Sequence, residues 1–371
     1  MPDELKQDHY KIVPRKKEES DQYHQGRGAQ INTKNKFLKT EITREHVEGI
    51  DEWTDPNVAT QYIEQEAKSI VNKVDSPDVG MWYSMNPYQG CEHGCIYCYA
   101  RPSHAYWGFS PGLDFETRLI AKPNAAALLR TELSRPGYLP SPICLGANTD
   151  PYQPVERKLK LTRELLEVLL ETRHPLTIIT KNALIERDLD LLQPLAEHGL
   201  LQVLISLTSL DSELSRRLEP RASTPLRRLQ TIRCLADAGI PVGVLIAPII
   251  PALNDQYLEA LLQQAREHGA KHASYALLRL PLEVADLFEQ WLISHYPDRA
   301  GHVLSLVRQL REGKLNQAGF GQRMRGNGNF ATLIAQRFRL AWRRLGYTHS
   351  PPQLDCSQFR RPAADGQLAL F

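Results

Sequence analysis

The feature that most limits the fold of this chain is an alternation of short apolar runs with amphipathic segments from residue 81 to about residue 280. In the amphipathic segments apolar residues recur at i, i+3, i+4 and i+7, which is typical of helices. Such alternation favours parallel strands joined by right-handed crossovers. The predicted strands are 81–86, 142–147, 176–180, 203–207, 241–247 and 273–278. The predicted helices among them are Asn124–Ser134, Thr162–Thr172, Arg187–His198, Pro225–Ala238 and Gln256–His268.

Local signals support these helix boundaries. Thr162 is a predicted N-cap, and Gly199, Gly239 and Gly269 stand where a glycine commonly ends a helix. Six strand–helix units in roughly 200 residues fit an α/β fold of the partial (β/α)6 TIM-like barrel type. The spacing alone equally allows a doubly wound sheet.

Three of the six cysteines, Cys91, Cys95 and Cys98, lie within eight residues at a C-x3-C-x2-C spacing. Three thiolates on one short loop can each bind one iron of a [4Fe–4S] cluster, whereas electron-transfer clusters usually have four cysteine ligands. With no fourth cysteine nearby, one iron would keep an open position at which another molecule can bind. The loop directly follows the first predicted strand, at the sheet edge where such folds place their chemistry, and this favours the barrel.

A structural zinc site is the alternative interpretation of the triplet. The three cysteines with His93 or His104 could form a Cys3His site. Structural zinc motifs usually pair two short knuckles across a longer spacer, and this segment has one compact triplet without a second knuckle. The spacing therefore favours an iron–sulfur cluster over zinc. The alternative function is a non-catalytic zinc- or cluster-stabilised nucleic-acid-binding protein.

The run NPYQGCEHGCIYCYARPSH resembles the radical SAM superfamily, whose signature is C-x3-C-x-aromatic-C. Tyr97 supplies the aromatic residue and is expected beside the cofactor. The resemblance covers about residues 81–280 and implies a [4Fe–4S] cluster that cleaves S-adenosylmethionine to a 5′-deoxyadenosyl radical, which abstracts hydrogen from a substrate. It also implies a reductant protein as electron donor. The flanking residues look like the branch related to spore photoproduct lyase, which is often called DNA repair photolyase-like.

The resemblance further implies cofactor contacts at the strand ends. Many members bind the methionine amino group through Gly-Gly-Glu after the second strand, where this chain has Asn148, Thr149 and Asp150 instead. We expect one of these three to substitute. In the lyase-like branch a lysine and a serine bind the cofactor carboxylate; Lys181 and Ser206 match them, and this pair suits an anion. The alternatives are a polar turn, a solvated lysine and a serine bonded to backbone.

Four further residues have weaker interpretations. Arg221 fits either a ligand contact or a surface salt bridge. Cys144 and Cys234 lie in apolar patterns and are interpreted as small buried hydrophobes. Cys356, in the irregular tail, is the candidate hydrogen donor, because some radical enzymes use a thiol for this step.

The sequence divides into three regions. Residues 1–80 form a polar, partly disordered N-terminal extension, in which 55–74 has a moderately helical pattern. Residues 81–280 form the core. Residues 281–371 form a helical and basic C-terminal region, with predicted helices Glu283–Tyr296, Ala300–Glu312 and Phe330–Leu345.

The segment from residue 299 to residue 346 contains ten Lys or Arg residues and one acidic residue, Glu312, although the formal net charge of the chain is only +2. A basic stripe with aromatic residues is typical of nucleic-acid binding, so nucleic acid is a candidate substrate. The alternative is that the arginines line the polar faces of helices. The helical spacing of Phe330, Phe338 and Trp342 favours core packing for the aromatic residues.

Composition and targeting signals exclude several classes of protein. A hydrophobic fraction of 42% over 371 residues is ample for a core. No apolar run approaches membrane-spanning length, and the N-terminal residues lack the apolar core of a signal peptide. Six cysteines in this length do not indicate a secreted disulfide scaffold. We expect a cytoplasmic protein without membrane contacts, in a compartment reducing enough for an open cluster.

Overall fold

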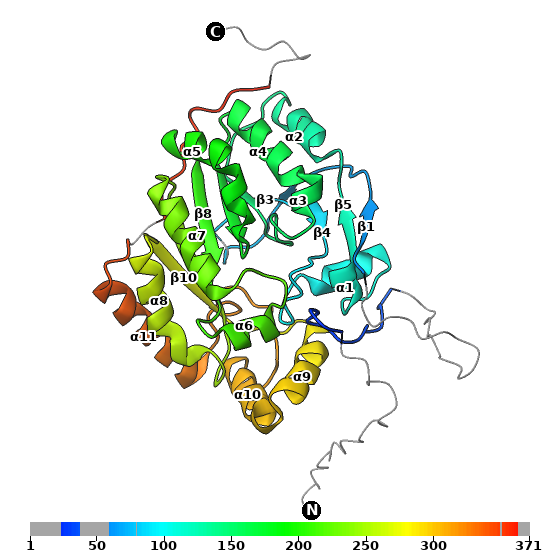
Figure 1. Ribbon diagram of the computed structural model, residues 1–371, viewed down its shortest axis with the longest axis vertical. Coiled ribbons are helices and arrows are strands. Elements are labelled where there is room, and N and C mark those ends of the chain that lie inside the picture. Colours follow the sequence, from blue (N-terminus) through cyan, green and yellow to red (C-terminus); the bar gives the residue numbers. More distant parts are fainter. Residues whose placement is uncertain (1–23, 38–58, 79, 349–350, 363–371) are drawn as a thin grey trace, which may run out of the picture.

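The computed structural model describes residues 24–37, 59–78, 80–348 and 351–362, and its centre is a seven-stranded sheet in the order β10-β9-β8-β7-β6-β3-β2 (Figure 1). The six strands from β3 to β10 pair in parallel, and β2 adds an antiparallel edge. All six predicted strands are confirmed. The strands are β2 (Val71–Lys73), β3 (Tyr83–Met85), β6 (Ile143–Leu145), β7 (Leu176–Thr180), β8 (Leu201–Ser206), β9 (Val242–Ile249) and β10 (His272–Leu277).

The parallel strands follow one another in the sheet in the same order as in the sequence. A doubly wound sheet has a point at which this order reverses, and no such point occurs among these strands. Their carboxyl ends therefore lie along one edge. Each predicted functional segment that follows a strand is brought to that edge.

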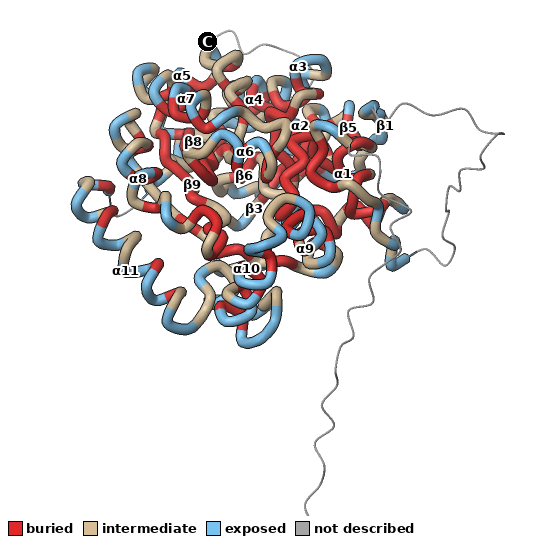
Figure 2. The backbone as a smooth tube through the Cα atoms, turned by 60° about the horizontal axis from the view of Figure 1, so that its bottom comes forward, coloured by how far each residue is buried: buried red, intermediate tan, exposed pale blue. Residues whose placement is uncertain are grey.

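A layer of helices covers the outer side of the sheet (Figure 1). Leucine and isoleucine side chains of these helices pack with those of the strands in one hydrophobic core. In Figure 2 the strands and the inward helix faces are buried, while the outer helix faces are exposed. The helices are α2 (Ala125–Leu133), α4 (Leu161–Glu171), α5 (Leu189–Glu197), α7 (Pro225–Asp237) and α8 (Leu258–Glu267), within two residues of the predicted bounds.

The helix-end predictions have mixed outcomes. Gly199, Gly239 and Gly269 follow their helices with φ of 67°, 77° and 104°, as predicted for terminating glycines. The predicted N-cap Thr162 is wrong: it lies inside α4, and its hydroxyl donates to the Pro151 carbonyl at 2.6 Å. Its backbone N–H is instead bound by the Glu156 carboxylate at 3.0 Å, from the preceding short helix α3 (Glu156–Leu159).

A second, smaller sheet has the order β1-β5-β4, with β1 (Gln61–Glu64), β4 (Tyr88–Gln89) and β5 (Arg118–Ala121). The helical pattern predicted for 55–74 is wrong over its described part, because residues 61–64 and 71–73 are strands. Tyr62, Ile63 and Val71 are strand formers, and pairing with β5 and β3 decides the conformation. Residues 55–58 lie outside the described part.

The described part of the C-terminal region contains three helices, as predicted: α9 (Val284–His295), α10 (Pro297–Leu310) and α11 (Gly328–Arg344). α9 and α10 pack against each other and share a hydrophobic cluster with α6 (Ser212–Leu218) and the cysteine loop. α11 packs on α8 beside the last strand of the sheet. In the described part of the chain, no helix has the length and hydropathy needed to cross a bilayer.

A side-chain contact joins the segment before β3 to the loop between α10 and α11, next to the ends of the sheet. The Arg323 guanidinium lies 2.7 Å from the Asp78 carboxylate, which also accepts a hydrogen bond of 2.6 Å from the Gly321 backbone. Asp78 precedes β3, whereas residues 321–323 belong to the loop between α10 and α11. This Asp78–Arg323 contact brings that loop beside the first parallel strand.

Candidate active site

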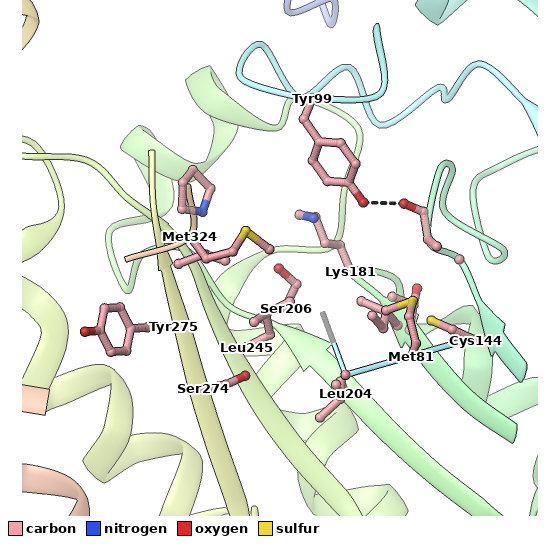
Figure 3. Close-up of a pocket in the computed structure, with 18 of the residues that line it drawn as sticks. Met81, Tyr99, Cys144, Lys181, Leu204, Ser206, Leu245, Ser274, Tyr275 and Met324 are labelled. Atoms are coloured by element: carbon pink, nitrogen blue, oxygen red, sulfur yellow. Dashed lines mark hydrogen bonds between the residues drawn. The ribbon is translucent and has the colours of Figure 1, made fainter. Parts of the chain in front are cut away.

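A cavity of about 700 Å³ lies between the cysteine loop and the carboxyl ends of the strands, and continues along the inner surface of the sheet (Figure 3). This volume is within the range of small-molecule sites. Phe338 and Trp342 of α11 and Met324 and Arg325 of the loop before it also contribute to the wall. The structure brings all of the predicted site residues except Cys356 to this cavity: Cys91, Cys95, Cys98, Tyr97, Asn148, Thr149, Asp150, Lys181 and Ser206.

The three thiols of the triplet are free and come from one loop. Cys91 and Cys95 are buried, and Cys98 is half-buried. Burial raises the pKa of the Cys95 thiol to about 12, so binding of a metal as thiolate would release protons. The donor set fits a [4Fe–4S] cluster, because each cysteine of such a cluster binds a different iron. Among the described residues, no three His, Cys, Asp or Glu side chains come together as a site for a single metal ion.

Neither histidine of the zinc alternative is presented to the cysteines as a ligand. His93 Nδ1 lies 3.3 Å from the Asp150 carboxylate, and its Nε2 lies 3.1 Å from the Asn182 amide nitrogen. His104 lies outside the cavity between Phe109 and Phe115, with ring centroids 5.4 and 5.5 Å away. Burial lowers the pKa of His104 to about 4, so it is a neutral core residue at neutral pH.

Asp150 connects the cysteine loop to the end of β7. Its carboxylate accepts hydrogen bonds from the Thr180 hydroxyl at 2.7 Å and the Lys181 backbone at 2.8 Å, in addition to the contact with His93. Burial alone would raise the pKa of Asp150, but His93 and these hydrogen bonds outweigh it and bring the pKa to about 2. Both carboxylate oxygens are therefore used within the chain.

Asn148 and Thr149 differ in what they leave available to a ligand. The Thr149 hydroxyl donates to the Gly90 carbonyl at 2.6 Å and accepts from Gln153, so it is turned toward the cysteine loop. The Asn148 amide nitrogen lies 3.2 Å from the Ser103 hydroxyl. For the Asn148 amide oxygen the described residues provide no donor, so it can accept a hydrogen bond from a ligand.

Lys181 and Ser206 face the cavity from the ends of β7 and β8 (Figure 3). The Ser206 hydroxyl is buried, at 1% exposure, and has no partner within the described part of the chain. The Lys181 ammonium likewise has no hydrogen-bond acceptor among the described residues. Burial alone would lower the pKa of Lys181, but Cys95 and Glu219 outweigh it and raise the pKa above its usual value. This pair offers a positive charge and an orphan hydroxyl to an anion.

A buried ion pair that the sequence prediction missed lies behind the cysteine loop. Glu219 pairs with Arg228, accepts a bond of 2.7 Å from the Thr208 hydroxyl, and also accepts from the Tyr97 hydroxyl. Burial would raise the pKa of Glu219, but Arg228 and Lys181 lower it. Tyr97 is thus fixed by its hydroxyl while its ring lines the cavity. The signal in the sequence is the turn Glu219-Pro220-Arg221 after the fourth strand, in which the acid as well as the arginine forms an ion pair.

That arginine, Arg221, forms a salt bridge with Glu92 at 3.3 Å, but Glu92 is buried, so the predicted salt bridge is present and is not a surface one. Cys144 is buried, as expected, but its side chain also lines the cavity from β6. Tyr99 is a further wall residue that the sequence gave no reason to select. Its hydroxyl donates to the Ala147 carbonyl (Figure 3).

Cys356 is not brought to the cavity, which corrects its candidate role as hydrogen donor. The neighbouring Asp355 backbone donates to the Gly199 carbonyl at 3.0 Å, and Gln358 donates to the His198 carbonyl at 2.7 Å. Both carbonyls precede β8, so this part of the tail runs along the amino ends of the strands. The cysteine loop lies at the opposite ends.

Part of the predicted polar extension supports the cysteine loop. The backbone N–H groups of Gly28 and Ala29 donate to the Glu116 carboxylate at 2.9 and 2.8 Å. The same carboxylate pairs with Arg101, which follows the loop and donates to the Cys95 carbonyl at 3.0 Å. Residues 27–29 and the cysteine loop are therefore linked through one buried carboxylate.

These features define an α/β protein with a thiol-lined cavity at the carboxyl ends of parallel strands. The model of the Radical SAM superfamily matches residues 85–265. An uncharacterised protein of Mycobacterium tuberculosis is 36% identical over 294 residues, which cover 78% of this chain and 84% of that protein. The chain belongs to the radical SAM superfamily.

Two further comparisons extend this result. An uncharacterised protein of Methanocaldococcus jannaschii is 26% identical over 242 residues, covering 65% of this chain and 86% of the relative. The structure of spore photoproduct lyase complexed with dinucleoside spore photoproduct matches with a TM-score of 0.57 and 18% identity, over 81% of this chain and 86% of the lyase. At this identity the similarity shows a shared fold.

Proposed function

We propose that this protein is a radical SAM enzyme in which Cys91, Cys95 and Cys98 hold a [4Fe–4S] cluster and the cavity binds S-adenosylmethionine. When bound, the cluster supplies the electron that cleaves the cofactor to a 5′-deoxyadenosyl radical. The observation that carries the proposal is the orphan Ser206 hydroxyl beside the unpaired Lys181 ammonium, in the same cavity as three free thiols. The sequential strand order supports a partial (β/α)6 barrel around this cavity.

The side chains have separate roles in this proposal. Lys181 and Ser206 both donate charge-assisted hydrogen bonds to the cofactor carboxylate, and Lys181 adds a positive charge. The Asn148 amide oxygen accepts from the cofactor amino group, in place of the Gly-Gly-Glu segment. Thr149 and Asp150 position the cysteine loop, because their polar atoms are already bonded within the chain.

The substrate in this proposal is nucleic acid or a component of it. The basic C-terminal region supports this, and so does the shared fold with a lyase solved with AdoMet and dinucleoside spore photoproduct. An external reductant protein delivers the electron.

The test is reconstitution of the protein with iron and sulfide under anaerobic conditions. We expect about four irons per chain, visible absorption typical of an iron–sulfur cluster, and formation of 5′-deoxyadenosine from S-adenosylmethionine after addition of dithionite. The C95S variant should lose both the absorption and the product, whereas C234S, changed on the outer helix α7, should keep both. Zinc binding without cofactor cleavage would instead support the non-catalytic alternative.

A further inference from the structure

Two arginines at the cavity wall have no carboxylate partner within the described part of the chain. Arg279 follows β10, and its guanidinium lies 4.9 Å from the centre of the Tyr99 ring. Arg325 lies in the loop before α11, with its guanidinium 4.1 Å from the centre of the Tyr275 ring. Stacking on an aromatic face holds a guanidinium plane while its N–H edges stay able to donate.

The acidic side chains of the cavity wall are already engaged elsewhere. The lining carboxylates are Asp78, which pairs with Arg323, and Asp150, which pairs with His93. Burial lowers the pKa of the Arg279 guanidinium, and the neighbouring Arg323 lowers it further. Lys181, Arg279 and Arg325 line the cavity against the two carboxylates, so its wall has positive charge in excess.

Most basic residues of the C-terminal region do not line the cavity. They lie at the surface or bind other parts of the chain. Arg311 is buried and donates to the Leu277 and Leu278 carbonyls at 2.8 and 2.9 Å. Arg337 pairs with Glu259 at 2.6 Å. Of the ten basic residues between 299 and 346, only Arg325 lines the cavity. Of the basic residues that give the C-terminal region its excess charge, Arg325 alone faces the cavity. Arg279, which follows β10, is a second arginine at the cavity wall.

We propose that Arg279 and Arg325, at the wall of the same cavity, form an anion subsite whose guanidinium groups bind phosphate oxygens of the substrate. This inference rests on the proposed function, in which the cofactor carboxylate occupies Lys181 and Ser206 and leaves the other cations to the substrate. A guanidinium fork matches phosphate oxygens with two parallel hydrogen bonds. Tyr275, on which Arg325 stacks, lies 4.6 Å from Phe338 between ring centroids. Phe338 and Trp342 also line the cavity, and such aromatic side chains can pack against a planar ring attached to a phosphate.

The phosphate can come from a nucleic-acid strand or from a free phosphorylated nucleoside, and the test distinguishes these sources. Binding of a short fluorescein-labelled oligothymidylate to the reconstituted protein is followed by anisotropy, with competition by thymidine monophosphate and by thymidine. We expect R279Q and R325Q each to weaken binding by about tenfold or more. R279K keeps the charge but loses the fork, and should bind between wild type and R279Q. R339Q, an exposed change on α11, is the control and should bind as wild type.

Competition by thymidine monophosphate but not thymidine supports the subsite and assigns it to a free nucleotide. If only unlabelled oligothymidylate competes, the result supports the subsite and shows that its phosphate comes from a nucleic-acid strand. Wild-type binding by both R279Q and R325Q, or equal competition by thymidine, would overturn the inference. Failure of the wild-type protein to cleave S-adenosylmethionine would remove the proposed function without changing these binding results, so the two failures are distinguishable.

Discussion

Gly28 lies directly against Gly94 of the cysteine loop, so closely that a Cβ atom on Gly28 would stand 1.8 Å from the Gly94 carbonyl oxygen. No side chain can be accommodated there unless the loop moves. A residue far from the cysteines in sequence therefore limits where their backbone can lie.

We predict that Gly28→Ala displaces the cysteine loop and lowers the free energy of unfolding by roughly 1–3 kcal/mol. Iron content after reconstitution should fall in parallel, since the three thiols would no longer keep their spacing. Gly301→Ala is the matched control, because Gly301 lies in α10 with no atom within 4 Å of a built Cβ. Unchanged iron content in the Gly28 variant would contradict the supporting role of residues 27–29.

Lys181 and Ser206 should contribute to cofactor affinity in different ways. We predict that Lys181→Met raises the Kd for S-adenosylmethionine roughly ten- to a hundredfold, as expected for loss of a hydrogen bond to a charged group worth about 1.5–3 kcal/mol. Ser206→Ala should also weaken binding. It should leave the cofactor-free protein equally or more stable, because it removes a buried hydroxyl that has no partner. Equilibrium dialysis and thermal unfolding measure the two effects, with the exposed Lys158→Met as control.

Asp150 should make the stability of the protein depend on pH in the acid range. Its pKa is about 2 in the folded protein, against an ordinary value of 3.8. Because the folded pKa is the lower one, its stabilisation of about 2 kcal/mol is complete above pH 4 and is lost as the pH falls toward 2. Asp150→Asn removes this contribution. We expect denaturant unfolding curves of variant and wild type, both without the cluster, to differ at pH 7 and to converge in acid.

Arg311 should hold the loop before α11 at the cavity. Its guanidinium donates to the Arg323 carbonyl at 2.7 Å as well as to carbonyls at the end of β10. Arg311→Met would leave buried carbonyls without donors, and we predict a loss of about 3 kcal/mol or more. Trypsin should then cleave faster after Arg323 and Arg325. The exposed Arg308→Met on the same helix should leave the rate unchanged, and equal rates in both variants would argue against this role of Arg311.

The helices and the longer strands of the core could be predicted from their periodicity. β3 and β6 have only three residues each, but they lie inside the longer predicted strand segments 81–86 and 142–147. β1, β2, β4 and β5 contain only two to four residues, and their pairing with distant segments decides their conformation. Lys181 and Ser206 could be located because they end predicted parallel strands. Tyr99 and Arg279 could not, since nothing local distinguishes a side chain that faces a cavity from one that faces solvent.

The contribution of residues 24–37 was also beyond prediction. Their polar composition indicates disorder, yet Gly28 and Ala29 bind a carboxylate that is itself buried by the core. The stabilising partner, Glu116, lies in an unremarkable short helix, α1 (Asp114–Thr117). Composition describes what a segment can bury by itself, and not what a neighbouring segment supplies.

The Asp78–Arg323 contact has a consequence for the passage of large molecules into the cavity. β3 and β10 belong to opposite ends of the sheet order and share no ladder, so the wall on this side is joined through side chains. Among the described residues, no hydrogen bond between backbone atoms links residues 76–78 with residues 319–325. Parting the contacts of Asp78 and Ser76 with Gly321 and Arg323 would open a lateral seam without breaking any strand. A long polymer could then enter sideways at an internal position and leave the same way, with no free end to thread.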